Sequence, residues 1–278
     1  MVTLSAPLRL EPAIGRHVRQ GGRRAGVIPR LVVVLLLLAG GAGLAHGAAW
    51  RGGWHPALPA DRSASPLGIP VQAPAGGGGY QILHDQDDGT HRPVAWDPCR
   101  PIHFVVRSEG SPSGGREAVD WALARMTAVT GLHFVDDGAT DEVPRADRPA
   151  ADRNRYGQRW SPVLIAWTDA KEYPGMEKYA ALGGPVAVDG EQRGARRYVS
   201  GVVLLNRTHL TEIATREDGQ RILRAVVLHE LGHVVGLDHV EGRDALMSPR
   251  PGVTAFDLGP GDLRGLVRLS HGPCFTDF

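Results

Sequence analysis

The stretch His229-Glu230-Leu231-Gly232-His233-Val234-Val235-Gly236-Leu237-Asp238-His239 decides how this chain folds. His229 and His233 are four residues apart, so on a helix their imidazoles lie one turn above each other and point to one place. Gly236 can adopt the backbone conformation that ends a helix, and the chain then turns back so that His239 approaches from another direction. Three neutral imidazoles with a fourth position open to water are typical of a catalytic zinc ion. We therefore predict one zinc ion with His229, His233 and His239 as its ligands.

Glu230 follows the first predicted ligand directly, so its carboxylate can reach a water molecule without occupying the metal. Zinc lowers the pKa of a bound water from about 16 to about 7, which makes a carboxylate a sufficient general base. The predicted reaction is hydrolysis of a peptide bond, in which Glu230 takes a proton from water and later gives it to the leaving amine. Asp238 is interpreted as local structural support beside His239.

Three other readings compete with this one. The histidines can be scattered core residues, which their regular spacing disfavours. The site can be a zinc-holding binding module without turnover, but binding alone does not need Glu230. An amidase acting on cell-wall peptides would share the same site and differ only in its cleft.

The segments around the histidines alternate between strand and helix patterns. The helix that carries them is predicted from Gly219 to Val235, and a short one from Gly261 to Leu269. A further helix is expected over Arg116–Thr130, ended by Gly131. Two runs, Tyr80–Leu83 and Pro93–Trp96, predict a hairpin that turns at Asp88-Gly89. Further strands are expected at 101–107, 132–135, 162–167 and 198–205, while residues 136–160 look like a surface excursion. The predicted fold class is α+β, with a mixed twisted sheet and about three helices.

Three parts of the sequence resemble the matrixin subgroup of the metzincins: residues 236–239 (Gly-Leu-Asp-His), 245–249 (Ala-Leu-Met-Ser-Pro) and 262–266 (Asp-Leu-Arg-Gly-Leu). The resemblance covers about residues 80–278 and implies a zinc endopeptidase that acts on polypeptides. It also implies that Met247 forms an apolar floor beneath the metal. By the same resemblance, Gly183–Val188 is an edge strand that pairs antiparallel with a bound peptide, with substrate contacts at Gly184, Val186 and Val188. Residues 248–258 would line the pocket for the residue after the scissile bond.

The sequence departs from the animal matrixins in two respects. It has no propeptide motif of the Pro-Arg-Cys-Gly kind, so latency by a cysteine switch is not expected. The histidine-containing segment that holds a second zinc is absent between Lys171 and Val188. Calcium has no clear signature either, because turn chemistry explains the acidic side chains at Asp85, Asp87 and Asp88.

The amino-terminal part of the chain is predicted to deliver the protein across a membrane. Residues 1–30 carry six arginines and one acid, and residues 31–50 are apolar or small, which indicates a signal peptide or a signal anchor. Residues 51–79 are rich in Gly, Pro and Ala and read as a linker. We expect the catalytic domain, residues 80–278, to lie outside the cell, either secreted or attached to the membrane by residues 31–50.

Charge and cysteine content set further limits. With 31 basic and 30 acidic side chains the net charge is +1, which predicts no nucleic-acid partner, and we expect a monomer. In an exported protein Cys99 and Cys274 favour a disulfide. The alternatives are two free thiols, or Cys99 acting as an inhibitory thiolate on the zinc.

Overall fold

The computed structural model describes residues 3–4, 35–36, 56, 60–190, 196–242, 245–249 and 255–276. Near the amino terminus, Thr3–Leu4 (β1) pairs antiparallel with Leu35–Leu36 (β2). The rest of the predicted export segment, 31–50, and most of residues 51–59 lie outside the described residues, so these assignments stay predictions. Across the described residues, no helix combines the length and the apolar character needed to cross a bilayer.

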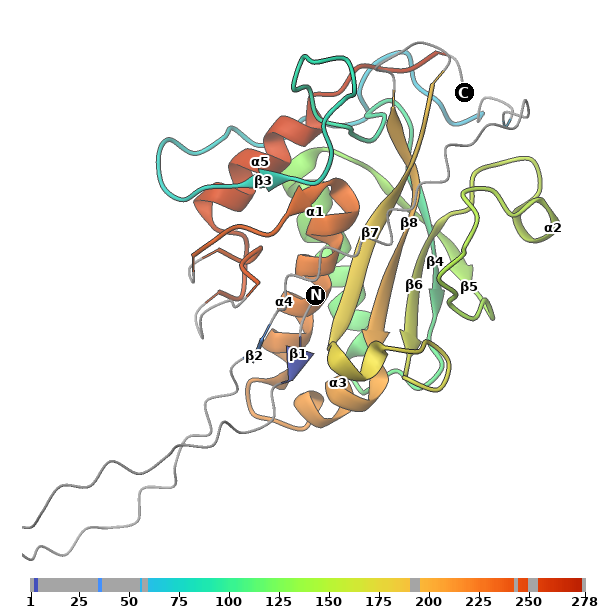
Figure 1. Cartoon of the computed structure of the whole chain (residues 1–278), viewed down its shortest axis with the longest axis vertical. Helices are drawn as coiled ribbons and strands as arrows, with labels where there is room; N and C mark the ends of the chain where they lie inside the picture. The colour runs from blue at the N-terminus through green and yellow to red at the C-terminus, as the bar shows by residue number, and fades with distance from the viewer. Residues whose placement is uncertain are drawn as a thin grey trace, which may run out of the picture.

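A five-stranded mixed sheet forms the centre of the fold, in the order β5-β4-β6-β8-β7 (Figure 1). Its parallel strands are Ile102–Arg107 (β4), Phe134–Ala139 (β5), Val163–Thr168 (β6) and Arg197–Asn206 (β8). Ala181–Val188 (β7) pairs antiparallel with β8 and forms one edge of the sheet. The sheet confirms the predicted α+β class, including the edge strand expected at 183–188.

Side chains from both faces of the sheet are buried. Phe104, Ile165 and Val203 belong to the main core, while Leu164 and Leu204, on the opposite face, belong to a second apolar cluster with Met176. All six residues of β6 are buried, because this strand lies near the middle of the sheet and both of its faces are covered. The continuous apolar run at 162–167 predicted this two-sided burial.

Two long helices cover the main core. Gly115–Thr130 (α1) and Gly219–Val235 (α4) contact each other, and Figure 1 shows them side by side along one face of the sheet. Gly131 ends α1 in the left-handed conformation with φ 69°. Pro260–Ser270 (α5) lies across the end of this layer, and Arg207–Ala214 (α3) connects β8 to α4. The sequence did not predict α3, because its apolar positions are few.

The surface excursion predicted at 136–160 is confirmed from residue 140 on, as a loop with one short helix, Arg153–Tyr156 (α2), whereas residues 136–139 continue strand β5. A buried ion pair holds this loop, with Arg148 Nε 2.7 Å from Glu142 Oε1. Arg148 also donates to the Ser200 hydroxyl on β8, at 3.0 Å. Another connection contains the 3-10 helix Met176–Lys178 (η1), whose first residue packs in the second apolar cluster.

The hairpin prediction at 80–96 is only partly right. Residues Gln81–Ile82 (β3) pair antiparallel with Leu237–Asp238 (β9), the segment that leads to the third predicted ligand, rather than with 93–96. The loop still closes on itself, because Val94 N–H donates to the His84 carbonyl and Gln86 N–H to the Arg92 carbonyl. Strand β9, rather than residues 93–96, is the partner of β3, because the chain turns back after Gly236 and leaves the backbone groups of β9 available for pairing.

Residues 60–79 contain no strand or helix, as expected of a linker, but they are bonded to the domain. Their backbone N–H groups donate to carbonyls of the domain at three places: Ser63 to Cys99, Leu67 to Pro98 and Val71 to Val129. Gly76, Gly77 and Gly78 adopt φ values of 70°, 73° and 64° beside the start of α5. The described part of the expected linker is therefore a strap that runs over the domain surface.

Candidate metal centre

The three predicted ligands converge on one point. The Nε2 atom of His239 lies 3.2 Å from Nε2 of His233 and 3.3 Å from Nε2 of His229. His229 and His233 project from the last turns of α4, and His239 follows β9, which turns back after Gly236. Within the described residues, these side chains form one of two clusters with metal-ligating atoms; the other holds the cysteines Cys99 and Cys274.

Backbone carbonyls orient the two helical imidazoles. His229 Nδ1 lies 2.7 Å from the Leu246 carbonyl, and His233 Nδ1 lies 2.8 Å from the Leu237 carbonyl. Because a carbonyl only accepts, each Nδ1 carries the proton and each Nε2 offers its lone pair to the common point. This donor set fits a zinc ion, which prefers neutral imidazole nitrogens held by such outer contacts.

Burial keeps the imidazoles neutral. It lowers the pKa of His229 and of His233 well below the ordinary histidine value, and it lowers the pKa of His239 to about 4. A neutral ring has a lone pair to give, so at neutral pH all three side chains are ready to bind a cation.

Glu230 lies on the same turn as His229 and is fully buried. A Cβ added at Gly183 of β7 would lie 2.7 Å from the Glu230 carbonyl oxygen and 2.9 Å from its Oε2. Glycine at 183 therefore lets the edge strand approach the glutamate closely. Burial raises the pKa of the Glu230 carboxyl.

Met247 lies against helix α4, which carries two of the predicted ligands. A Cβ added at Gly232 would be 2.5 Å from the Met247 sulfur, so glycine at 232 provides the space for this side chain. Gly236 has φ 123°, and its N–H donates to the carbonyls of Gly232 and His233 at the end of α4. The helix ends where the spacing predicted, and Asp238 caps the following turn by accepting from the N–H of His239 at 2.7 Å.

The sequence analysis missed the role of Asp262. Its buried carboxylate accepts from three backbone N–H groups: Leu246 at 2.8 Å, Met247 at 3.4 Å and Gly259 at 2.8 Å. These contacts fix the turn that carries Met247 and the carbonyl of Leu246, to which His229 donates. The sequence offered two signals: an acid in the first turn of a helix, which is common and has many uses, and the resemblance of residues 262–266 to the matrixins, which gave Asp262 no role of its own.

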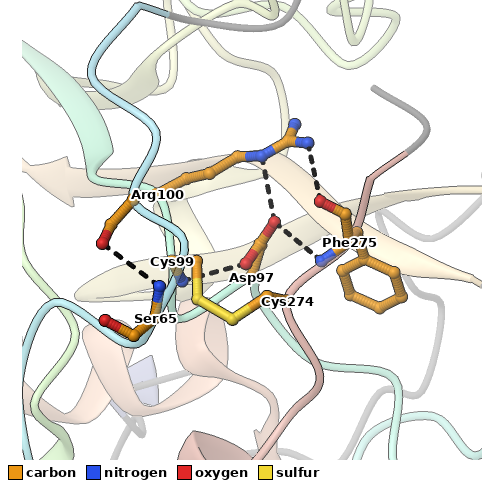
Figure 2. The surroundings of a disulfide bond; sticks show 7 residues. Ser65, Asp97, Cys99, Arg100, Cys274 and Phe275 are labelled. Carbon is orange, nitrogen blue, oxygen red and sulfur yellow. Dashed lines mark hydrogen bonds and ion pairs between the residues drawn. A yellow bond between two sulfur atoms is a disulfide. The ribbon is translucent and has the colours of Figure 1, made fainter.

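The two cysteines form a disulfide, Cys99–Cys274, across a sequence separation of 175 (Figure 2). Asp97 lies beside it and accepts from the N–H groups of Cys99, at 2.9 Å, and Phe275, at 3.2 Å. Arg100 Nε is 2.9 Å from the same carboxylate. The bond confirms the disulfide prediction and rules out both the free thiols and the inhibitory thiolate.

The predicted substrate contacts lie on the edge strand β7, where Gly184 and Val186 are partly exposed and Val188 is buried. Residues 250–254 of the predicted pocket segment 248–258 lie outside the described residues. Of the rest, Ser248 and Leu258 are buried, and the Arg221 guanidinium lies 3.8 Å from the centre of the Phe256 ring.

Comparisons with known proteins agree with this geometry. Residues 167–270 match the matrixin family model. A matrilysin from Felis catus is 32% identical over 128 residues, which cover 38% of this chain and 48% of that protein. A macrophage metalloelastase from Oryctolagus cuniculus is 43% identical over 51 residues, which cover 17% of this chain and 11% of that protein. The matched region thus spans less than half the length of either relative.

Proposed function

We propose, on the premise that this chain is a matrixin-like metzincin, that it is a zinc-dependent endopeptidase. The observation that carries the proposal is the convergence of three Nε2 atoms beside a buried glutamate. A zinc ion held there by His229, His233 and His239 would supply Lewis acidity for activating water and polarising the scissile carbonyl.

Glu230 moves the protons in the proposed reaction. Its carboxylate takes a proton from the attacking water, and the carboxyl then protonates the nitrogen of the leaving amine. Burial raises the pKa of Glu230, which brings it closer to neutral pH, where a group both accepts and returns a proton efficiently. We propose that the proton transfer takes place beside β7, because Glu230 lies against Gly183 of that strand.

The edge strand β7 orients the substrate. A polypeptide that pairs antiparallel with this strand has its backbone fixed next to Glu230. We propose contacts with Gly184, Val186 and Val188 for this peptide, and an apolar floor formed by Met247 beneath the metal. The substrates are polypeptides outside the cell, since residues 31–50 are proposed to export the chain or anchor it to the membrane.

Replacing Glu230 tests the proposal. We expect Glu230→Gln to keep one zinc per chain, measured by atomic absorption, and to lose peptide hydrolysis by a factor of at least about 100. His233→Ala is the matched comparison, because it should lose the zinc as well as the activity. Incubation of the full chain with a diverse peptide library, with and without a zinc chelator, gives the cleavage preference.

The same measurements separate the alternative readings. A chain that holds zinc but cuts no peptide in the library, while it cleaves cell-wall peptides, would be an amidase. Hydrolysis that survives unchanged in Glu230→Gln would refute the proton transfer assigned to this residue.

A further inference from the structure

The direction of the backbone groups along β7 is fixed by one close approach. A Cβ added at Gly201 of β8 would lie 2.8 Å from the carbonyl oxygen of Gly184, so this oxygen points towards β8. An oxygen that pointed away from β8 would lie on the far side of the β7 backbone and could not come so close to the Cβ position of Gly201. Because successive residues of a strand direct their backbone groups to opposite sides, Gly183 and Pro185 direct theirs to the open edge.

The nature of Pro185 agrees with this assignment. The register runs without a shift through Gly184↔Val202, Pro185↔Gly201 and Val186↔Ser200. A proline whose nitrogen faced β8 would remove a ladder bond and place its ring against the neighbouring strand, whereas on an edge strand its nitrogen faces outward. Along the described part of the chain, no strand pairs with the outer edge of β7.

The outer edge of β7 near the glutamate therefore presents unequal groups, with Gly183 partly exposed and Pro185 buried. Gly183 offers one N–H donor and one carbonyl acceptor, but Pro185 offers only a carbonyl acceptor. Gly183 lies against Glu230, so it is near the bond to be cut. On an antiparallel peptide, the residue opposite Pro185 lies two positions before the residue opposite Gly183, on the amino-terminal side.

We propose that Pro185 is a specificity-determining residue that removes one hydrogen-bond donor from the peptide-binding edge. The peptide residue that faces Pro185 donates its N–H to the Pro185 carbonyl, while its own carbonyl receives no bond from β7. Backbone recognition at this position is thus half of that at Gly183. The chain consequently depends on peptide side chains for affinity on the amino-terminal side of the cut. This inference rests on the proposed function, because it takes the ligand of β7 to be a polypeptide substrate.

The test adds the missing donor and removes its acceptor. Binding is measured by calorimetry on full-length, zinc-loaded Glu230→Gln protein, with and without Pro185→Ala, using the tightest-binding member of a short-peptide library. We expect Pro185→Ala to tighten binding about two- to tenfold, the value of one hydrogen bond. Each peptide amide is then replaced in turn by an ester, whose carbonyl accepts hydrogen bonds weakly. At one position on the amino-terminal side, the ester should abolish the gain.

Two results would overturn the inference: equal affinity with and without the Pro185→Ala substitution, or a gain that survives every ester replacement. Pro101→Ala is the matched control. Pro101 directly precedes β4, which two strands separate from β7, so this substitution should leave the affinity for the peptide unchanged. Pro185→Gly should reproduce the gain if Pro185→Ala distorts the strand, and thermal unfolding reports such distortion. Hydrolysis of the same peptide by protein with Glu230 intact tests the proposed function separately. If the peptide binds as expected for Pro185 but is not cleaved, the proposed function is contradicted and the inference about Pro185 is not.

Discussion

Asp262 connects the turn at Leu246 and Met247 to the start of its own helix α5 through a single carboxylate. It accepts from Leu246 and Met247 in the turn below the metal centre, and from Gly259 at the start of α5. Leu246 in turn accepts from His229 Nδ1 at 2.7 Å. The orientation of the first proposed zinc ligand therefore depends on a side chain that is not itself one of the proposed ligands.

Replacing Asp262 should weaken zinc binding without removing any ligand. In Asp262→Ala the N–H groups of Leu246 and Met247 lose their acceptor, and the carbonyl that fixes His229 becomes mobile. We expect zinc affinity to fall about 10- to 100-fold, measured by competition with a chromophoric chelator. Asp257→Ala is a control, because Asp257 pairs with Arg125 on the surface, and its affinity for zinc should not change. An unchanged affinity in Asp262→Ala would show that the turn holds its shape without the carboxylate.

At the scale of residues, the sequence predicted the parts of the site that are close together in the chain. His229, His233 and Gly236 lie on one helix, whose period relates spacing directly to direction. His239 follows from the reversal that Gly236 permits. Asp262 could not be predicted, because its partners lie in loops up to 16 residues earlier, and only the fold brings them together.

At the scale of elements, the last four residues of the strap, Gly76–Gly79, and strand β3 contact two elements that shape the candidate metal centre. Arg264 of α5 donates to the carbonyls of Gly76 and Gly78, and Gly79 lies against Val240. Strand β3 then pairs with β9, whose Leu237 carbonyl orients His233. A run of glycines usually indicates a flexible linker, but here three positive φ values and close packing require glycine. The sequence could not reveal this, because α5 begins far downstream of the glycines.

A side chain at Gly261 should push the strap away. An added Cβ there would lie 2.0 Å from the carbonyl oxygen of Gly79, which is backbone and cannot rotate aside. We expect Gly261→Ala to destabilise the protein by about 1–3 kcal/mol. Hydrogen exchange should accelerate at the Leu83 N–H, which donates to the Gly236 carbonyl.

The matched control for this variant is Gly184→Ala, because an added Cβ at 184 meets nothing within 4 Å. Its stability should stay within about 0.5 kcal/mol of the parent. If Gly261→Ala unfolded at the same denaturant concentration as Gly184→Ala, the close approach of Gly79 to α5 would not be a constraint in solution.

At the scale of the whole molecule, both ends of the described domain are fastened near the start of β4. The disulfide joins Cys99 to Cys274, and the Asp97 carboxylate holds the N–H of Phe275 (Figure 2). From the amino-terminal side, Ser63 and Leu67 donate to the carbonyls of Cys99 and Pro98. The sequence predicted the pairing of the cysteines from their number and the expected export, but composition alone placed residues 60–79 outside the domain.

The folded unit should therefore begin near residue 60 rather than at residue 80. A fragment of residues 80–278 loses the backbone bonds made by Ser63, Leu67 and Val71, and the ion pair in which Asp61 lies 2.9 Å from His103. At about 1 kcal/mol for each backbone bond, the loss is about 3 kcal/mol, which lowers the melting temperature of a domain this size by about 6–12 °C. Circular dichroism of the oxidised fragments would measure the melting temperature, and residues 60–278 should melt within about 2 °C of the full chain because they keep all these contacts.

Equal melting temperatures of the two fragments would mean that residues 60–79 lie on the domain without stabilising it. In that case the boundary at residue 80, drawn from composition alone, would be the better description of the domain.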